Sequence, residues 1–211
     1  MGHRALLDEQ DVCEVDGVRL TTPARTWGDL AGMGLTMQEL VTAGDSLLQR
    51  SDGPPRPSGV LGHNPLATLD DLREMLDRRR DVPGIPAVRR ALVKVRPGVD
   101  SAPESILRQL IVAAGYPEPL VNLPVRLPDG RLIVPDLQFR EYRIAIQYEG
   151  KHHNSVDQIG KDIGRDFAFI SIGWITVKAD RAILQASGRE RFLARLAHAF
   201  ATRGVPVPRA V

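Results

Sequence analysis

The sequence contains a single cysteine, Cys13, among its 211 residues. A chain with one cysteine has no internal disulfide, and this usage is typical of proteins that work in a reducing compartment. The N-terminus shows no basic stretch followed by an apolar one, and the longest apolar run, residues 167–177, is too short to span a bilayer. We therefore expect a cytoplasmic protein without a membrane partner.

Several common ligand-binding signatures are also missing. The sequence has no Cys/His cluster at zinc-ligand spacing, no glycine-rich phosphate loop of the Walker type and no Gly-x-Gly-x-x-Gly string. His3, His63 and His198 occur singly, so each is expected to be an ordinary surface or core residue. These absences predict that the protein uses no nucleotide cofactor.

The composition is that of a soluble globular protein, with 43% hydrophobic and 26% charged residues. Its length allows one substantial core, or one core with a smaller satellite. Residues 100–211 carry 15 Lys/Arg against 12 Asp/Glu, whereas residues 1–99 carry 13 against 14. The small basic excess of the second half has the sign that suits a nucleic-acid partner.

The first half, residues 1–98, is predicted to be mainly helical. Thr22 followed by Pro23 is a typical helix start, because the hydroxyl caps free N–H groups and proline suits the first turn. A stretch rich in proline and glycine, residues 51–59, predicts a surface loop or linker. Further helices are expected over residues 36–48, 68–80 and 85–94.

The second half, residues 99–211, is predicted to be an α/β domain in which helices sandwich a mixed β-sheet. Asp129–Gly130 is a strong turn signal between two strands. The expected order is a helix from Ser101, strands over 122–126, 131–140 and 142–149, a helix over 156–170, a strand over 174–178 and one or two helices over 180–203. The helix over 156–170 places Ile159, Ile163, Phe167 and Ile170 on one apolar face.

Three charged residues in this half suggest a metal-dependent centre. Asp136 follows Pro135 in one apolar strand, and Glu149 and Lys151 end the next one. Because side chains alternate along a strand, Glu149 and Lys151 project to the same side. Two carboxylates and an ammonium that converge suit a hard, oxygen-seeking cation with a bound water.

A simpler interpretation is that these polar residues line the solvated face of a hairpin. Strings of the form Asp-x12-Glu-x-Lys occur by chance in many chains, and Asp136 after Pro135 is also suited to open a turn. The apolar context favours the metal site, because a carboxylate among apolar residues is costly unless it is paired or bound to a metal.

Five motifs in this order resemble those of a known nuclease family. The chain is similar to the Vsr-like branch of the PD-(D/E)XK nuclease superfamily, and within it to domain-of-unknown-function family 559. The resemblance covers roughly residues 100 to 185 and implies a restriction-endonuclease-like fold. It rests on Ser101-x-x-Glu104-x-x-Leu107-Arg108, Pro135-Asp136, Tyr148-Glu149-Gly150-Lys151-His152-His153, Asp162-x-x-Arg165 and Gly173-Trp174.

The resemblance implies a role for each matching residue. Asp136 and Glu149 would hold Mg²⁺ or Mn²⁺ with a backbone carbonyl near Gly150. Lys151 would offset the charge that develops on the phosphate. His153 would act as base or as leaving-group acid, since its pKa lies near neutrality. Because both Lys151 and His153 are present, the identity of the base stays open.

Other residues carry weaker implications. Glu104 approaches the metal in the family, but Ser101-x-x-Glu104 is equally a capping box. The resemblance suggests DNA contacts from Arg108, His152 and Arg165. For Asp162 and Arg165 the alternative is a solvated helix face with an i,i+3 pair. Trp174 is expected in the core rather than as a platform for base stacking.

The front half has a resemblance of its own. Val15-Asp16-Gly17-Val18 and the segment from Thr21 to Ala31 resemble the region that follows the winged helix in AbiEi-antitoxin-like proteins. The chain begins after that winged helix, so sequence-specific DNA recognition by it is not expected. Arg25 and Trp27 fall in a capped amphipathic helix that is expected to pack against the second half of the chain.

The predicted function is a divalent-metal-dependent endonuclease that hydrolyses phosphodiester bonds in DNA, in repair or phage defence. The alternative is a nuclease fold without catalysis, a DNA- or protein-binding regulator of an AbiEi-like toxin–antitoxin system. The DNA structure that is cleaved, and whether RNA is the substrate, stay open. A homodimer is a further alternative, since a small nuclease that makes two cuts often dimerises.

Overall fold

The computed structural model describes residues 7–49, 65–79, 84–150 and 156–206, and for residues 156–163 the backbone only. The chain divides into two compact units, Met1–Ala102 and Pro103–Val211. The sequence placed this boundary between residues 98 and 99. In the described ranges, no helix combines the length and the apolar character needed to cross a membrane.

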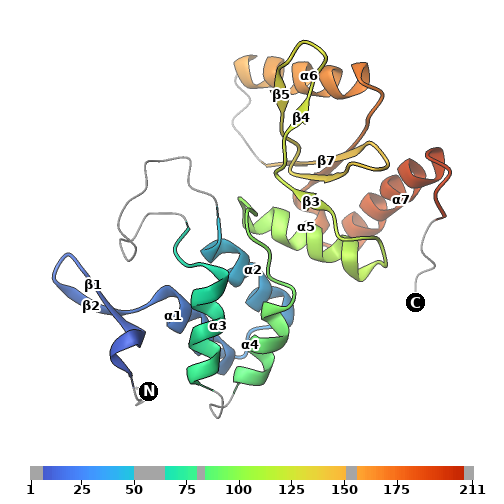
Figure 1. Cartoon of the computed structure of the whole chain (residues 1–211). Coiled ribbons are helices and arrows are strands. Elements are labelled where there is room, and N and C mark those ends of the chain that lie inside the picture. Colours follow the sequence, from blue (N-terminus) through green and yellow to red (C-terminus); the bar gives the residue numbers. More distant parts are fainter. Residues whose placement is uncertain (1–6, 50–64, 80–83, 151–155, 207–211) are drawn as a thin grey trace. The chain divides into compact units, whose positions relative to one another are not determined.

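The first unit contains a β-hairpin followed by helices (Figure 1). Its strands β1 and β2 pair antiparallel, with Val15 opposite Val18. The elements are a 3-10 turn (Glu9–Asp11), β1 (Val12–Val15), β2 (Val18–Thr21), α1 (Pro23–Leu30), a 3-10 turn (Ala31–Met33), α2 (Met37–Leu47), α3 (Leu69–Arg78) and α4 (Ile85–Leu92).

Threonine caps start three of these helices, and two of the caps, at Thr22 and Thr36, were predicted from the sequence. The hydroxyl of Thr22 accepts a hydrogen bond from the backbone N–H of Arg25 at the start of α1. Thr36 and Thr68 form full capping boxes with carboxylates three residues later. These side chains satisfy N–H groups that have no partner within their own helix.

The β1–β2 hairpin was missed by the sequence analysis, which treated this segment as irregular. Its turn is Asp16–Gly17, and both residues have positive φ, 50° and 79°. Asp-Gly between apolar residues is a typical two-residue hairpin signal, because such a turn needs residues that tolerate left-handed backbone. The signal was therefore present between Val15 and Val18.

The core of the first unit is built around Trp27. Its side chain is buried and its indole Nε1–H donates to the carbonyl of Leu40 at 2.8 Å. Beside it lies a buried ion pair, in which Arg25 Nη1 is 2.5 Å from Asp11 Oδ2 and both side chains are fully buried. Arg25 and Trp27 thus pack inside this unit, whereas the sequence analysis expected their helix to pack against the second half.

The second unit contains a four-stranded sheet, a separate hairpin and three long helices. In Figure 1, β7 lies between α6 and the pair formed by α5 and α7. The elements are α5 (Ala102–Ala113), β3 (Leu120–Val121), β4 (Val125–Arg126), β5 (Leu132–Ile133), β6 (Leu137–Phe139), β7 (Ile144–Glu149), α6 (Val156–Ser171), β8 (Ile175–Asp180), a 3-10 turn (Arg181–Leu184) and α7 (Ala186–Thr202).

The four strands follow the order β3-β6-β7-β8, and the sheet is mixed. β3–β6 and β6–β7 are antiparallel, whereas β7 and β8 are parallel and are joined through α6. A parallel neighbour requires a crossover connection, which the helix supplies. The fold is therefore mixed α/β.

The predicted strand over residues 131–140 is wrong as a single element. It splits into β5, which pairs with β4, and β6, which pairs with β3 and β7. The break falls at Pro135, which has no N–H to donate to a ladder and whose ring fixes φ. The chain therefore leaves the hairpin and enters the main sheet immediately before Asp136.

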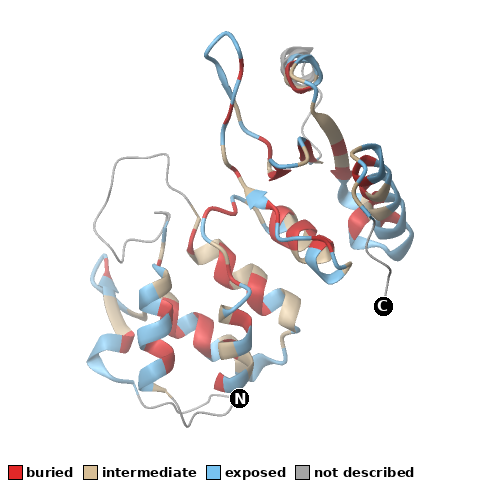
Figure 2. Ribbon diagram, turned by 45° about the vertical axis from the view of Figure 1, so that its right-hand side comes forward, coloured by how far each residue is buried: buried red, intermediate tan, exposed pale blue. Residues whose placement is uncertain are grey.

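The two faces of the four-stranded sheet are covered differently. Leu107 of α5 and Phe192 of α7 belong to the large core on one face. Phe169 of α6 packs with Ala145 of β7 and Val125 of the hairpin on the other. Figure 2 shows α5 and α7 each with a buried and an exposed side.

The predicted apolar face of α6 is wrong at Phe167 and Ile170, whose side chains are 70% and 64% exposed. Among the α6 side chains that the structure describes, Ala168 and Phe169 are buried instead, and Phe169 contacts the ring of Trp174 with centroids 5.8 Å apart. Trp174 is thus a packing residue, as expected.

Candidate functional site

Strand register brings the two predicted carboxylates to the same face of the sheet. Leu137 and Ile146 pair across β6 and β7 and belong to the large core, so their immediate neighbours point to the opposite face. We call this the polar face, because its side chains include Asp136, Gln147, Glu149 and Lys178. Continuing the register by one residue sets Asp136 opposite Gln147, and Gln147 in turn pairs with Lys178.

Asp136 is held by the backbone of the neighbouring strand. Its side chain is half-buried, and its Oδ2 accepts a hydrogen bond from the N–H of Tyr148 at 2.6 Å. This N–H lies beyond the last pair of the β6–β7 ladder, Leu137–Ile146. The carboxylate of Asp136 therefore supplies its acceptor and is fixed in position immediately before β6.

Glu149 is more exposed than the sequence analysis expected. Its side chain is 51% exposed at the end of β7, so the argument that apolar surroundings make its charge costly was wrong. Its Oε1 lies 2.8 Å from Nζ of Lys178 on the adjacent parallel strand. The charge of Glu149 is offset by this lysine.

Lys178 joins two carboxylates. Its Nζ lies 2.6 Å from Oδ2 of Asp166 on α6 and 2.8 Å from Oε1 of Glu149. The hydrogen bonds to Asp166 and to Glu149 raise the pKa of Lys178 above its ordinary value of 10.5. Lys178 therefore stays positively charged at neutral pH and is an electrostatic group rather than a base.

Glu104 is connected to the site through Asn122. The glutamate is 9% exposed, and its Oε2 accepts a hydrogen bond from Nδ2 of Asn122 at 2.9 Å. The backbone N–H of Asn122 donates to the carbonyl of Asp136 at 3.0 Å. Asn122 adopts a positive φ of 46° to make both contacts. Glu104 is thus linked to the segment that carries Asp136.

Three predicted residues, Lys151, His152 and His153, lie outside the described residues. Asp162 lies on α6, where only the backbone is described. The chemistry predicted for these residues remains a prediction.

Two arginines expected to contact DNA are placed differently from one another. Arg108 is 2% exposed, and its Nη1 lies 2.6 Å from Oε1 of Glu118. Its guanidinium is engaged inside the unit. Arg165 is half-buried on α6, one residue before Asp166.

A hollow of about 570 Å³ borders Lys178 at the edge of the sheet. It lies between β8 and α7, and its lining includes Arg195 and His198. Nη2 of Arg195 donates to the carbonyl of Lys178 at 2.9 Å, which ties α7 to the strand. Two cationic side chains and an imidazole therefore border this hollow.

Sequence analysis missed Lys178, Asp166 and Gln147. Lys178 follows the pattern Thr176-x-Lys178-x-Asp180, whose alternation marks one strand face as polar. The strand–helix–strand order predicted for residues 142–178 implies a parallel neighbour, from which the contact with Glu149 could have been anticipated. Asp166 belonged to none of the motifs from which the site was predicted.

The donor atoms of the polar face suit a hard cation. Asp136 and Glu149 offer carboxylate oxygens, and the buried amide of Gln147 has no hydrogen-bond partner among the described residues. Across the part of the chain that the structure describes, no group of three or more His, Cys, Asp or Glu side chains is placed to hold a metal ion. The polar face thus fits Mg²⁺ or Mn²⁺ in donor type, with two carboxylates as its acidic ligands.

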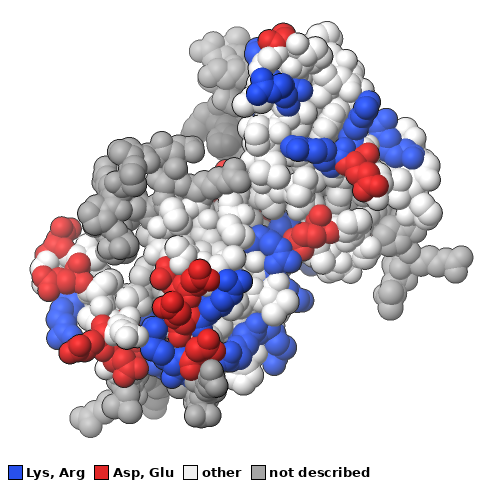
Figure 3. Space-filling model, in the orientation of Figure 1, with Lys and Arg blue, Asp and Glu red and all other residues white. Residues whose placement is uncertain are grey.

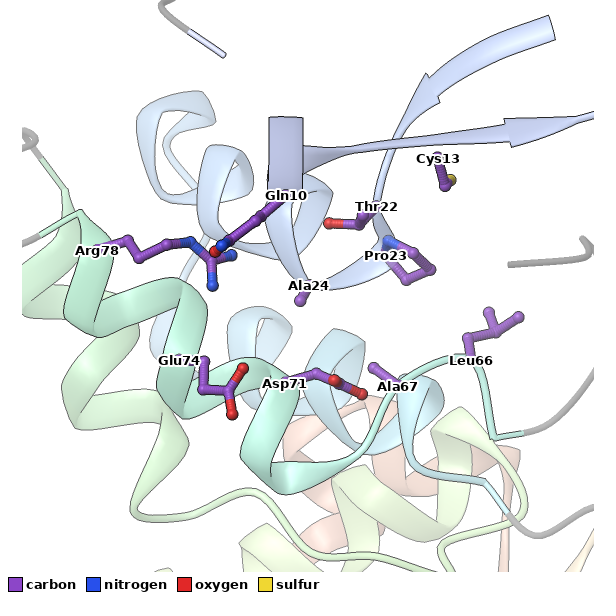
Figure 4. Close-up of a pocket in the computed structure, with 10 residues that line it drawn as sticks. All are labelled: Gln10, Cys13, Thr22, Pro23, Ala24, Leu66, Ala67, Asp71, Glu74 and Arg78. Atoms are coloured by element: carbon purple, nitrogen blue, oxygen red, sulfur yellow. The ribbon is translucent and has the colours of Figure 1, made fainter. Parts of the chain in front are cut away.

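A second hollow, of about 370 Å³, lies in the first unit (Figure 4). Asp71 and Glu74 of α3 line one side and Thr22 and Pro23 line the other. The carboxylate of Asp71 is occupied in capping α3, where Oδ2 accepts from the N–H of Thr68 at 2.7 Å. Its polar lining is therefore explained in part by helix capping.

On the face drawn in Figure 3, basic and acidic side chains of the described residues are interspersed. Several arginines pair with nearby carboxylates, such as Arg131 with Asp129 at 2.7 Å.

Comparisons of the chain with protein-family models, with curated proteins and with solved structures find no match. The chemistry of the chain is therefore inferred from its own side chains.

Proposed function

We propose that this chain is a divalent-metal-dependent endonuclease that hydrolyses phosphodiester bonds in DNA. The observation that carries the proposal is the placement of Asp136 and Glu149 on one sheet face with Lys178 beside them. Two carboxylates and a cation at adjacent strand ends are what hydrolysis of a phosphodiester requires. We further propose that the second unit has a restriction-endonuclease-like fold.

Each residue has a task in this proposal. Asp136 and Glu149 hold Mg²⁺ or Mn²⁺, which when bound polarises the scissile phosphate and lowers the pKa of a coordinated water. The N–H of Tyr148 binds one oxygen of Asp136 and so fixes the position of this carboxylate on the polar face. Lys178 keeps its proton and offsets negative charge that develops on the phosphate.

The base and the DNA contacts come from several further residues. Lys151 and His153 follow Glu149 directly in the sequence and are proposed to act on the attacking water or the leaving group. Arg195 and Arg165 are proposed to contact the DNA backbone, because guanidinium groups bind phosphate well.

A nicking assay tests the proposal. Supercoiled plasmid is incubated with pure protein in Mg²⁺, Mn²⁺ or EDTA, and Asp136→Ala and Glu149→Ala are compared with wild type. Asp129→Ala is the matched control, because it removes an exposed carboxylate from the β4–β5 hairpin turn. We expect metal-dependent nicking that is lost in the first two variants and kept in the third. Equal activity in all four proteins would point to a contaminant and reject the proposal.

The second candidate function is a nuclease fold that binds DNA or protein without catalysis, as in a regulator of an AbiEi-like toxin–antitoxin system. The ion pair of Glu149 with Lys178 favours it, because an ammonium already offsets the carboxylate that would hold the metal. Calorimetry separates the two candidates. Salt-dependent DNA binding without Mn²⁺ uptake would support the regulator.

A further inference from the structure

Gln147 is a buried polar residue whose hydrogen bonds are not made. It lies in the middle of β7 with 1% of its surface exposed, and both Oε1 and Nε2 lack a hydrogen-bond partner within the described structure. A buried polar group that is left unsatisfied destabilises the folded protein. Buried polar atoms in native proteins are nearly always bonded, so such an exception calls for a ligand or another explanation.

The register of the sheet places this amide within the proposed centre. Gln147 lies opposite Asp136 on one side and pairs with Lys178 on the other. Glu149 is two residues further along β7 and therefore points to the same face. On the polar face, the amide of Gln147 thus lies between the fixed carboxylate of Asp136 and the ammonium of Lys178.

A glutamine amide differs from its neighbours in being neutral. Its carbonyl oxygen is a ligand that Mg²⁺ and Mn²⁺ accept, and it adds no negative charge to a pair of carboxylates. The other glutamine of the polar face, Gln138, is anchored through its Nε2, which donates to the carbonyl of Leu123 at 2.6 Å, although its Oε1 also lacks a partner among the described residues. Gln147 has no such anchor among the described residues.

We infer that Gln147 supplies its Oε1 as a third protein ligand to the divalent cation held by Asp136 and Glu149. This inference rests on the proposed function. A site of two carboxylates and one amide balances a doubly charged ion. It also gives a partner to the amide oxygen that the metal-free protein leaves unsatisfied.

Gln147→Met separates a ligand from a packing residue. Methionine has a similar length and removes the unsatisfied atoms, so in EDTA the variant should melt at or above the wild-type temperature. If Gln147 is a ligand, calorimetry should show Mn²⁺ binding weakened at least about tenfold. Gln138→Met is the matched control: it should melt lower in EDTA, because it breaks a bond to Leu123, and keep the wild-type Mn²⁺ affinity.

A second variant guards against a folding defect. Gln147→Glu restores an oxygen donor, so Mn²⁺ binding should return to wild-type strength or exceed it even if Gln147→Met is unstable. Equal Mn²⁺ affinity of wild type and Gln147→Met would overturn the inference and leave the two-carboxylate centre standing. The inference would also be overturned if Gln147→Met lost Mn²⁺ binding and Gln147→Glu did not restore it. Absence of Mn²⁺ binding by the wild type would instead reject the metal-dependent function itself, and the inference with it.

Discussion

The ammonium of Lys178 and the carboxylate of Glu149 lie 2.8 Å apart on neighbouring parallel strands. Asp166 approaches the same ammonium from α6 at 2.6 Å. In the metal-free protein, one lysine therefore separates two carboxylates that would otherwise repel each other. A metal cation bound beside Glu149 would offset part of the negative charge that Lys178 offsets in the metal-free protein.

Lys178→Met should destabilise the metal-free protein, and Mn²⁺ should restore much of the lost stability. The pairs are partly exposed, so the loss is expected to be about 1 kcal/mol, or a melting temperature lower by about 2–4 °C. Mn²⁺ should restore much of it by supplying positive charge, while nicking should fall by about 10²–10³. Melting curves in EDTA and in Mn²⁺ measure the first two effects. Lys94→Met, an exposed lysine of the first unit, is the control; equal melting of both variants in EDTA would show that the Lys178 pairs do not stabilise the sheet.

Asp11→Ala should strongly destabilise the first unit. Asp11 and Arg25 are both fully buried, so removing the carboxylate leaves a buried guanidinium with less compensation. Breaking such a pair costs about 3–5 kcal/mol, and the lower end is expected because Asp29 also accepts from Arg25. Urea denaturation measures the change. The double variant Asp11→Leu with Arg25→Met should recover stability, because it removes both buried charges. The control is Asp70→Ala, which breaks a largely exposed pair with Arg73. Its free energy of unfolding should stay within about 0.5 kcal/mol of wild type. A loss below 1 kcal/mol in Asp11→Ala would contradict the burial of this pair.

The same carboxylate predicts a loss of stability in acid. Burial is the largest influence and raises the pKa of Asp11, but the hydrogen bonds and charge of Arg25, with a hydrogen bond from Arg78, outweigh it and lower the pKa below 3.8. A lowered pKa in the folded state adds stability above the unfolded value and withdraws it as the pH falls through the folded value. The free energy of unfolding should therefore fall below pH 3.8. Asp11→Asn should show a shallower decline, and parallel curves for both proteins would assign the acid loss to other groups.

Two glycine-to-alanine changes should have opposite signs. At Gly188, near the start of α7, an added Cβ would lie 1.9 Å from the carbonyl oxygen of Ala182, a backbone atom that cannot move aside easily. Gly188→Ala should lose at least about 1–3 kcal/mol. At Gly164 in α6 nothing lies within 4 Å of the added atom, so Gly164→Ala should gain up to about 1 kcal/mol through helix propensity. Thermal melts of both variants decide the matter, and a stabilised Gly188→Ala would contradict the packing at this turn.

Features governed by local chemistry could be predicted from the sequence. The caps at Thr22 and Thr36 formed as expected, because a hydroxyl and the next helical N–H groups decide the start of a helix. The break at Pro135 and the turn at Asp16 were accessible to the same kind of reasoning and were overlooked.

Features that depend on contacts between residues far apart in the sequence could not be predicted in this way. The apolar residues of α6 fit a helical period, yet Phe169 is buried against the sheet and Phe167 is exposed. The packing partners of the helix, and not its periodicity alone, decide which face is buried. The pairing of Gln147 with Lys178 depends on the register of two strands separated by a helix. Part of the candidate centre is therefore a product of tertiary structure.

The parallel pairing of β7 and β8 also has a consequence for the time course of folding. These strands meet only after the whole of α6 has been spanned, whereas the first unit joins neighbouring helices through shorter connections. Non-local pairing slows folding, because loop closure must precede the contacts that reward it. Each unit contains one tryptophan, Trp27 or Trp174, so single-tryptophan variants report on them separately. In refolding followed by fluorescence, the signal of Trp27 should settle before that of Trp174, which would leave the sheet with the candidate centre as the last part of the chain to form.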